Sequence, residues 1–154
     1  MSYAGILAQI KTTLDNTVEN VGLTHDYMRW AIDESAFLDL AKTAIGGVDQ
    51  IRVWMIDYAG FTSEEPWISR PTKSIRVHTF VLHGYLGLDD SAATAKTFAA
   101  LAEAVCTALE DDATLNADAL SAYREPCQLA VDHVLFYSKL CHHATITLQV
   151  AEIV

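Results

Sequence analysis

Basic residues are scarce in this chain. Its 154 residues contain 10 Lys and Arg against 20 Asp and Glu, which gives a formal net charge of -10 at pH 7. A protein that binds duplex DNA on its own gains affinity by neutralising phosphates with Lys and Arg. This charge balance therefore argues against a free-standing DNA-binding protein.

Cysteine and glycine are also few, and each shortage argues against a kind of site. The three cysteines, Cys106, Cys127 and Cys141, are odd in number and widely spaced. That pattern favours small buried side chains in a reducing compartment over a disulfide framework. The seven glycines are scattered at predicted turns, so the sequence has no glycine-rich loop for a nucleotide phosphate.

Long apolar runs are absent as well. No window approaches the roughly 20 apolar residues that a membrane span requires, and the first residues lack the basic start and apolar core of a signal peptide. We therefore expect a soluble protein made in the cytosol. Hydrophobic residues nevertheless make up 51% of the chain, which leaves room for an oligomer interface as well as a core.

Three segments carry apolar residues at the three- and four-residue steps of an amphipathic helix. They are residues 3–20, residues 33–45 and residues 91–110. The apolar positions of the third helix are Thr94, Phe98, Leu101, Ala102, Val105 and Leu109. Residues 89–91, which begin with Asp89 and Asp90, are expected to cap its N-terminus.

Four further segments have the features of β-strands, which are apolar residues at alternate positions or many branched and aromatic side chains. They are residues 51–58, 75–83, 127–137 and 140–150, and the last two form a hairpin. A helix with one apolar face needs a sheet to cover it. We therefore predict a single α+β domain over residues 1–154, with a mainly antiparallel sheet of about four strands, a long helix packed on one face, and one or two N-terminal helices.

Three segments connect these elements. Residues 24–30 show no clean period and are interpreted as a short extended or irregular link. Gly84 and Gly87 are expected to permit a sharp turn into the helix at 91–110. Residues 60–72 break every periodicity, and a loop of that length in a compact domain is more often functional or mobile than idle.

The sequence shows no cluster of residues with the spacing of a catalytic or metal-binding site. Cys141, His142 and His143 are consecutive in a predicted strand, so at most Cys141 and His143 face the same side, and two ligands do not make a zinc site. The acidic pairs are adjacent residues in loops or at helix ends, where solvation and capping explain them. We therefore predict no metal, no cofactor and no enzymatic activity.

Four stretches of sequence carry a resemblance to a known family. They read Thr-His-Asp-Tyr-Met-Arg-Trp at 24–30, Val-Trp-Met-Ile at 53–56, Arg-Val-His-Thr-Phe-Val-Leu-His-Gly-Tyr-Leu-Gly-Leu-Asp-Asp at 76–90, and Leu-Cys-His-His-Ala-Thr-Ile-Thr-Leu at 140–148. In these residues, and in the order of its predicted elements, the chain resembles the neck and tail-terminator proteins of tailed bacteriophages. The resemblance covers nearly the whole chain and contains no catalytic signature.

The resemblance implies a structural virion protein, made in the host cytoplasm, that forms a homo-oligomeric ring, typically of six copies. Such a ring caps the tail tube and joins it to the head-completion proteins of the neck. Because every copy is acidic, DNA is expected to pass through the ring without specific binding.

Docking surfaces are expected in the loop 60–72 and in the polar connection that follows the helix 91–110. The candidate partner-binding residues are Glu64, Glu65, Trp67, Ile68, Arg70, Asp111 and Asp112. Trp67 either anchors a partner or folds back over its own sheet. The acidic helix end at residues 110–112 is expected to meet a basic group of a neighbouring subunit.

A second hypothesis comes from another class of protein. The chain is then a small ligand-binding or enzymatic α+β domain with a pocket between sheet and helix, and His78, His83 or His143 are its candidate residues. This hypothesis predicts a monomer or dimer with a concave polar pocket, whereas the terminator hypothesis predicts a ring with a central hole.

Overall fold

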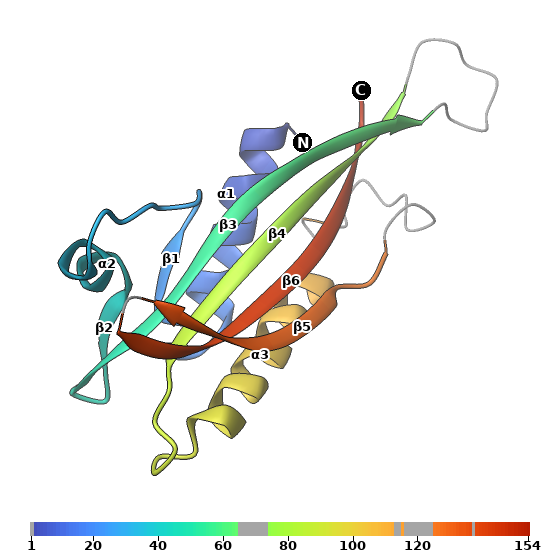
Figure 1. The fold of residues 1–154 in the computed structure, drawn as a ribbon. Coiled ribbons are helices and arrows are strands. Elements are labelled where there is room, and N and C mark those ends of the chain that lie inside the picture. Colours follow the sequence, from blue (N-terminus) through green and yellow to red (C-terminus); the bar gives the residue numbers. More distant parts are fainter. Residues whose placement is uncertain (1, 65–73, 113–114, 116–124, 137) are drawn as a thin grey trace.

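The computed structural model describes residues 2–64, 74–112, 115, 125–136 and 138–154. The order of its elements is α1 (Tyr3–Thr17), β1 (Leu23–His25), α2 (Glu34–Ala41), β2 (Lys42–Ile45), β3 (Val48–Glu64), β4 (Ile75–Gly87), α3 (Thr94–Asp111), β5 (Gln128–Phe136) and β6 (Lys139–Ile153) (Figure 1). Among the described helices, none has the length and apolar character needed to cross a membrane.

The six strands form one mixed sheet. Its order is β1-β3-β4-β6-β5, and β2 pairs with the start of β3. The pairs β3–β4, β4–β6 and β5–β6 are antiparallel, whereas β1 runs parallel to β3. The prediction of a mainly antiparallel sheet of about four strands with one long helix is therefore wrong, since the sheet has six strands of mixed direction and three helices accompany it.

The two strands that the prediction missed are short. β1 has three residues, too few to show an alternating pattern, and it pairs with residues 53–55 from a distant part of the chain. Residues 42–45, which form β2, have an apolar spacing that predicts a continued helix. Helix α2 ends at Ala41 instead, and Gly46 and Gly47, both at positive φ, let β2 fold back on β3.

Gly84 continues β4 instead of ending it. The predicted turn at Gly84 and Gly87 is wrong, because β4 runs without interruption to Gly87. Trp54 of β3 pairs directly with Gly84, and a Cβ atom at Gly84 would lie 2.6 Å from the Trp54 ring. Glycine is required here because a neighbouring side chain occupies the space of a Cβ.

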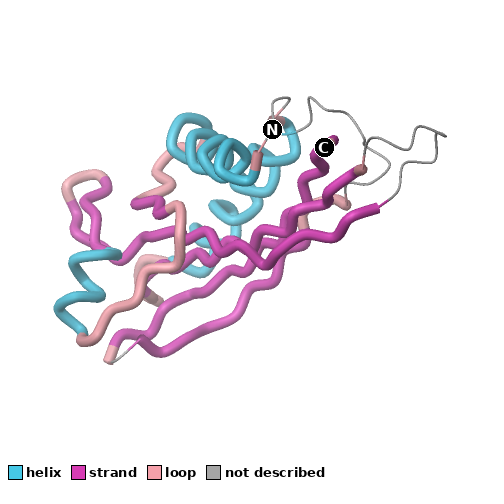
Figure 2. Tube along the Cα trace, turned by 90° about the horizontal axis from the view of Figure 1, so that it is seen from above, coloured by secondary structure: helices cyan, strands magenta, loops and turns pink. Residues whose placement is uncertain are grey.

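The helices cover the two faces of the sheet unequally. α1 and α3 pack on one face, which we call the helix-bearing face, while α2 lies toward the other side at one end of the sheet (Figure 2). The main core, between the sheet and α1 and α3, includes the fully buried Trp54, Phe80 and Phe98. On the opposite face, the open face, a smaller apolar cluster joins Phe37 of α2 to Tyr85.

Strands β3 and β4 extend as a long hairpin beyond the helices (Figure 1). The loop predicted at residues 60–72 begins later than expected, because residues 60–64 belong to β3 and pair with residues 75–79. A β-bulge shifts the register between Tyr58 and Gly60, and Gly60 has a φ of 117°.

Helix α3 also begins later than predicted. Its first residue is Thr94, and its N-cap Ala93 has a left-handed backbone and makes no side-chain capping bond. Asp89, one of the predicted caps, instead accepts hydrogen bonds from the Ser91 hydroxyl and the Ala92 N–H. These bonds lower the pKa of the Asp89 carboxyl, so the carboxylate stabilises the turn before the helix.

Candidate functional site

One edge of the sheet presents apolar side chains to solvent. Leu129, Val131 and Leu135 of β5 are 37%, 49% and 65% exposed, and we call these three side chains the β5 row. The register partners of Leu129 and Val131 on β6 are Ile146 and Ala144, which belong to the main core. The β5 row therefore lies on the helix-bearing face, at an edge where α3 approaches the strand but leaves these three side chains partly exposed.

β5 is also an open edge of the sheet. It has nine residues and, among the described strands, pairs only with β6. Half of its backbone N–H and C=O groups therefore point away from the sheet, toward water or toward another strand. Asp132 is the only Asp, Glu, Lys or Arg in β5. A long apolar edge strand with one charged residue can pair with a strand of another chain.

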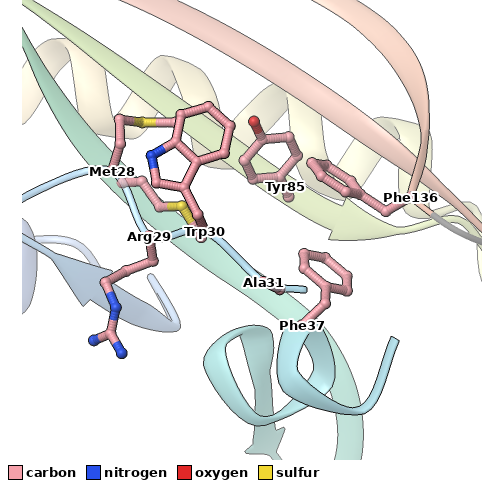
Figure 3. A pocket seen from close by; sticks show the side chains of 8 residues that line it. Met28, Arg29, Trp30, Ala31, Phe37, Tyr85 and Phe136 are labelled. Carbon is pink, nitrogen blue, oxygen red and sulfur yellow. The ribbon is translucent and has the colours of Figure 1, made fainter. Parts of the chain in front are cut away.

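A second candidate site is an apolar pocket on the open face (Figure 3). The pocket has a volume of about 230 Å³ and lies between the link after β1, helix α2 and the sheet. Its lining residues are Met28, Arg29, Trp30, Ala31, Phe37, Met55, Tyr85 and Phe136. Trp30 is 85% exposed, and the Arg29 guanidinium points away from the other lining side chains (Figure 3). The lining suits an apolar group.

A chain of hydrogen bonds adjoins this pocket. His143 Nδ1 lies 2.7 Å from Asp132 Oδ1, and His143 Nε2 lies 3.1 Å from His83 Nδ1. Because a carboxylate only accepts, His143 Nδ1–H donates to Asp132, and His143 Nε2 accepts from His83. Tyr85, which lines the pocket, stacks on His143 with ring centroids 4.8 Å apart. The fold thus brings together two of the three histidines named for the ligand-binding hypothesis.

His78, the third of these histidines, lies on the helix-bearing face in a buried network. Its Nδ1 accepts from the Tyr58 hydroxyl at 2.9 Å, and its Nε2–H donates to Glu152 at 2.9 Å. Burial raises the pKa of the Tyr58 hydroxyl, which therefore stays protonated and donates. The network joins β3, β4 and β6 to one another, and it is separate from His83 and His143.

We expect the stability of the fold to fall as the pH is lowered through 6.5. Burial first, and then the neighbouring His143, lower the pKa of His83 below its ordinary 6.5. Burial, and then His133, do the same for His142. Well above pH 6.5 both side chains are neutral in the folded and unfolded chain, so the stability is complete there. As the pH falls below 6.5, these histidines bind protons in the unfolded chain at a higher pH than in the folded chain. The free energy of unfolding therefore decreases until the pH reaches the lower pKa values of the folded chain.

Urea unfolding at about pH 7.5 and about pH 5.5, on either side of the ordinary histidine pKa, measures this loss. The variant His83→Gln should lose less stability over that interval than the wild type. Equal losses in the two proteins would contradict the role given to His83.

The acidic end of α3 is bound largely within the chain. The Asp112 carboxylate accepts hydrogen bonds from Gln9 Nε2 at 3.0 Å and from the Thr13 hydroxyl, both on α1. The Glu110 carboxylate accepts a backbone N–H just before β5 at 2.9 Å. Asp111 is exposed. α1 thus supplies part of what the sequence led us to seek in a neighbouring subunit, and a basic group of such a subunit at this helix end, Asp111 and Asp112 included, stays a prediction.

Of the other predicted partner-binding residues, the structure describes only Glu64. Glu64 is the last residue of β3. Glu65, Trp67, Ile68 and Arg70 lie outside the described residues, as does most of the polar connection after α3. The hypothesis that Trp67 anchors a partner stays a prediction.

The cysteines are free thiols in this fold. Cys141 is buried, and burial raises the pKa of its thiol to about 11, which makes it a poor nucleophile. A hydrogen bond with Cys127 lowers the pKa of Cys106. The described residues contain no group of three His, Cys, Asp or Glu side chains that could hold a metal ion.

Reasoning from the sequence found β5 as a strand but missed the β5 row. The alternation in residues 127–137 indicated one apolar face, and an apolar face is ordinarily expected to be buried. The available signal was the large share of hydrophobic residues, 51%, which predicts more apolar surface than one core needs. The sequence matches no protein-family model and no curated protein.

Proposed function

We propose that this chain is a structural subunit that assembles with copies of itself into a ring, as the tail terminators of tailed bacteriophages do. The ring would cap a tail tube and join it to the head-completion proteins of the neck. The observation that carries the proposal is the β5 row, which places three exposed apolar side chains on an edge strand that pairs, among the described strands, only with β6.

Charge supports a second copy as the partner of this edge. Each chain has a formal net charge of -10, so two copies repel each other over most of their surface. The β5 row carries no carboxylate, and the one acid of β5, Asp132, faces the opposite side of the sheet. Copies can therefore approach at the β5 row with less electrostatic cost than elsewhere, while burial of apolar surface favours the contact.

Under this proposal DNA passes through the ring without sticking. We expect a ring built from chains of this charge to have an acidic lumen, and an acidic wall cannot gain affinity by releasing the counterions of the phosphates. A channel lined by Lys and Arg in an image of the assembled ring would contradict this part of the proposal.

Light scattering coupled to size exclusion, followed by negative-stain imaging, tests ring formation. We expect a wild-type ring with a central hole. The variant Val131→Glu puts a carboxylate into the contact in every copy and should raise the concentration needed for assembly by more than about tenfold.

Val48→Glu is the matched control, because Val48 is 65% exposed at the start of β3, where it pairs with Ile45 of β2 and not with β5. It should assemble like the wild type. A wild-type chain that stays monomeric at every concentration tested would contradict the proposed function.

A second candidate function is a ligand-binding domain, and the apolar pocket beside the Asp132–His143–His83 chain favours it. It predicts a monomer or dimer that binds a small apolar molecule next to Trp30. The same light-scattering experiment gives the oligomeric state, and a change in tryptophan fluorescence that is lost in Trp30→Phe would identify the occupied pocket.

A further inference from the structure

The sheet has a second open edge, on the side opposite β5. β1 pairs with β3 only at residues 53–55, and β2 pairs only with residues 48–51. From Ile56 to Glu64, β3 pairs with β4 on one side and with no described strand on the other. The far part of this free edge belongs to the portion of β3 that extends beyond the helices (Figure 1).

The two open edges have the right relative direction to pair with each other between copies. β3 is antiparallel to β4, β4 to β6, and β6 to β5, so β5 runs antiparallel to β3. A neighbouring copy related by rotation about a ring axis keeps these directions. Its β3 edge would therefore meet the β5 edge as an antiparallel pair, and such a contact is head-to-tail, as ring closure requires.

The side chains at the two edges are also compatible. Phe61 is 52% exposed and pairs with His78, whose side chain lies on the helix-bearing face. The β5 row lies on the same face, so a sheet continued from one copy to the next would place Phe61 beside the β5 row. Residues 60–63 carry no charge, which lets two acidic chains approach.

The bulge at Tyr58 and Gly60 marks where such pairing would stop. Bulges end regular pairing on an edge strand, so the regular segment that can add a strand runs from Gly60 to Glu64.

Within one copy, Gln128 at the start of β5 stands level with Asp57 of β3, through the partners Thr147 and Val81. Residues 60–64 lie beyond Asp57 along β3, so β5 of one copy can pair with them only if the next copy is displaced along the strand direction. The tilted strands of a closed β-barrel are staggered in the same way.

We infer that β5 of one copy adds to residues 60–64 of β3 of the next copy, so that the ring is closed by a continuous intersubunit sheet with Phe61 packed on the β5 row. This inference rests on the proposed function and names its contact. The partner is a second copy of this chain, and the mode of recognition is the addition of a strand to an open edge.

Two variants, each blocking one edge, test the inference. Val131→Glu blocks the β5 edge, and Phe61→Glu blocks the β3 edge. Both positions are about half exposed, at 49% and 52%, so the folded monomer tolerates the change. At a concentration where the wild type just forms rings, each variant alone should remain monomeric. Mixed in equal amounts, they should form a discrete heterodimer, because one intact β5 edge can still pair with one intact β3 edge.

Circular dichroism and a thermal melt show that each variant is folded, and Phe61→Ser is a milder substitute if Phe61→Glu is not. Val48→Glu should form rings and should not rescue either variant. A ring formed by the folded Phe61 variant, or a mixture that stays monomeric, overturns the inference while the proposed function stands. A monomeric wild type overturns the proposed function and the inference together.

Discussion

Replacing Trp54 by alanine is expected to lower the free energy of unfolding by about 3–5 kcal/mol. Trp54 is fully buried in the main core, and its ring stacks against Phe98 of α3 with centroids 6.4 Å apart. The ring also covers Gly84, which has no side chain that could move into the space left behind. The cavity would therefore stay largely open, and the loss is a large fraction of the roughly 5–15 kcal/mol of an ordinary domain.

Urea unfolding followed by circular dichroism measures this loss. Trp30→Ala is the matched control, because it removes the same side chain from a site that is 85% exposed. It should change the stability by no more than about 0.5 kcal/mol. Similar losses in Trp54→Ala and Trp30→Ala would mean that Trp54 does not pack as described.

Replacing Gly22 by alanine is expected to cost about 2–5 kcal/mol, from two separate effects. Gly22 has a φ of +92°, and a residue with a Cβ atom pays about 1–2 kcal/mol for a left-handed backbone. Its Cβ would also lie 2.4 Å from the Arg52 carbonyl oxygen, and relieving such overpacking costs about 1–3 kcal/mol more. The Arg52 backbone belongs to β3 and pairs there with Leu86 of β4, so it cannot shift without moving the sheet.

Gly47→Ala separates the two effects. Gly47 has a φ of +81°, but a Cβ there would meet nothing within 4 Å. This control should therefore lose only the backbone term, about 1–2 kcal/mol. Equal losses of stability for Gly22→Ala and Gly47→Ala would rule out the contact with Arg52 as a source of the effect.

The helices were the most predictable part of the fold. α1 lies within the predicted segment 3–20, and α3 overlaps the predicted segment 91–110 but begins three residues later and ends one residue later. The agreement arises because the recurrence of apolar residues at helical steps is a property of each segment alone. The second helix was predicted too long, since residues 42–45 continue a helical spacing but pair with β3. Pairing with a distant strand overrides a weak local pattern.

The candidate site was less predictable. The acidic residues at the end of α3 could be named from the sequence, but not that Asp112 accepts hydrogen bonds from α1, which lies about a hundred residues earlier in the chain. His83 and His143 were named as well, yet their contact with each other depends on the register between β4 and β6. Register joins segments far apart in the chain, and periodicity carries no information about it.

The sequence by itself determined the acidic charge, the surplus of apolar residues, and the segments that form helices and long strands, because composition and spacing are local quantities. Only the tertiary structure decided that Gly84 makes room for Trp54, that β1 and β2 end where they do, and that β5 and the far half of β3 each have one side with no described strand beside it. The exposure of an edge depends on where every other element stops over the sheet. The surface on which the proposed assembly depends is for that reason a property of the folded chain alone.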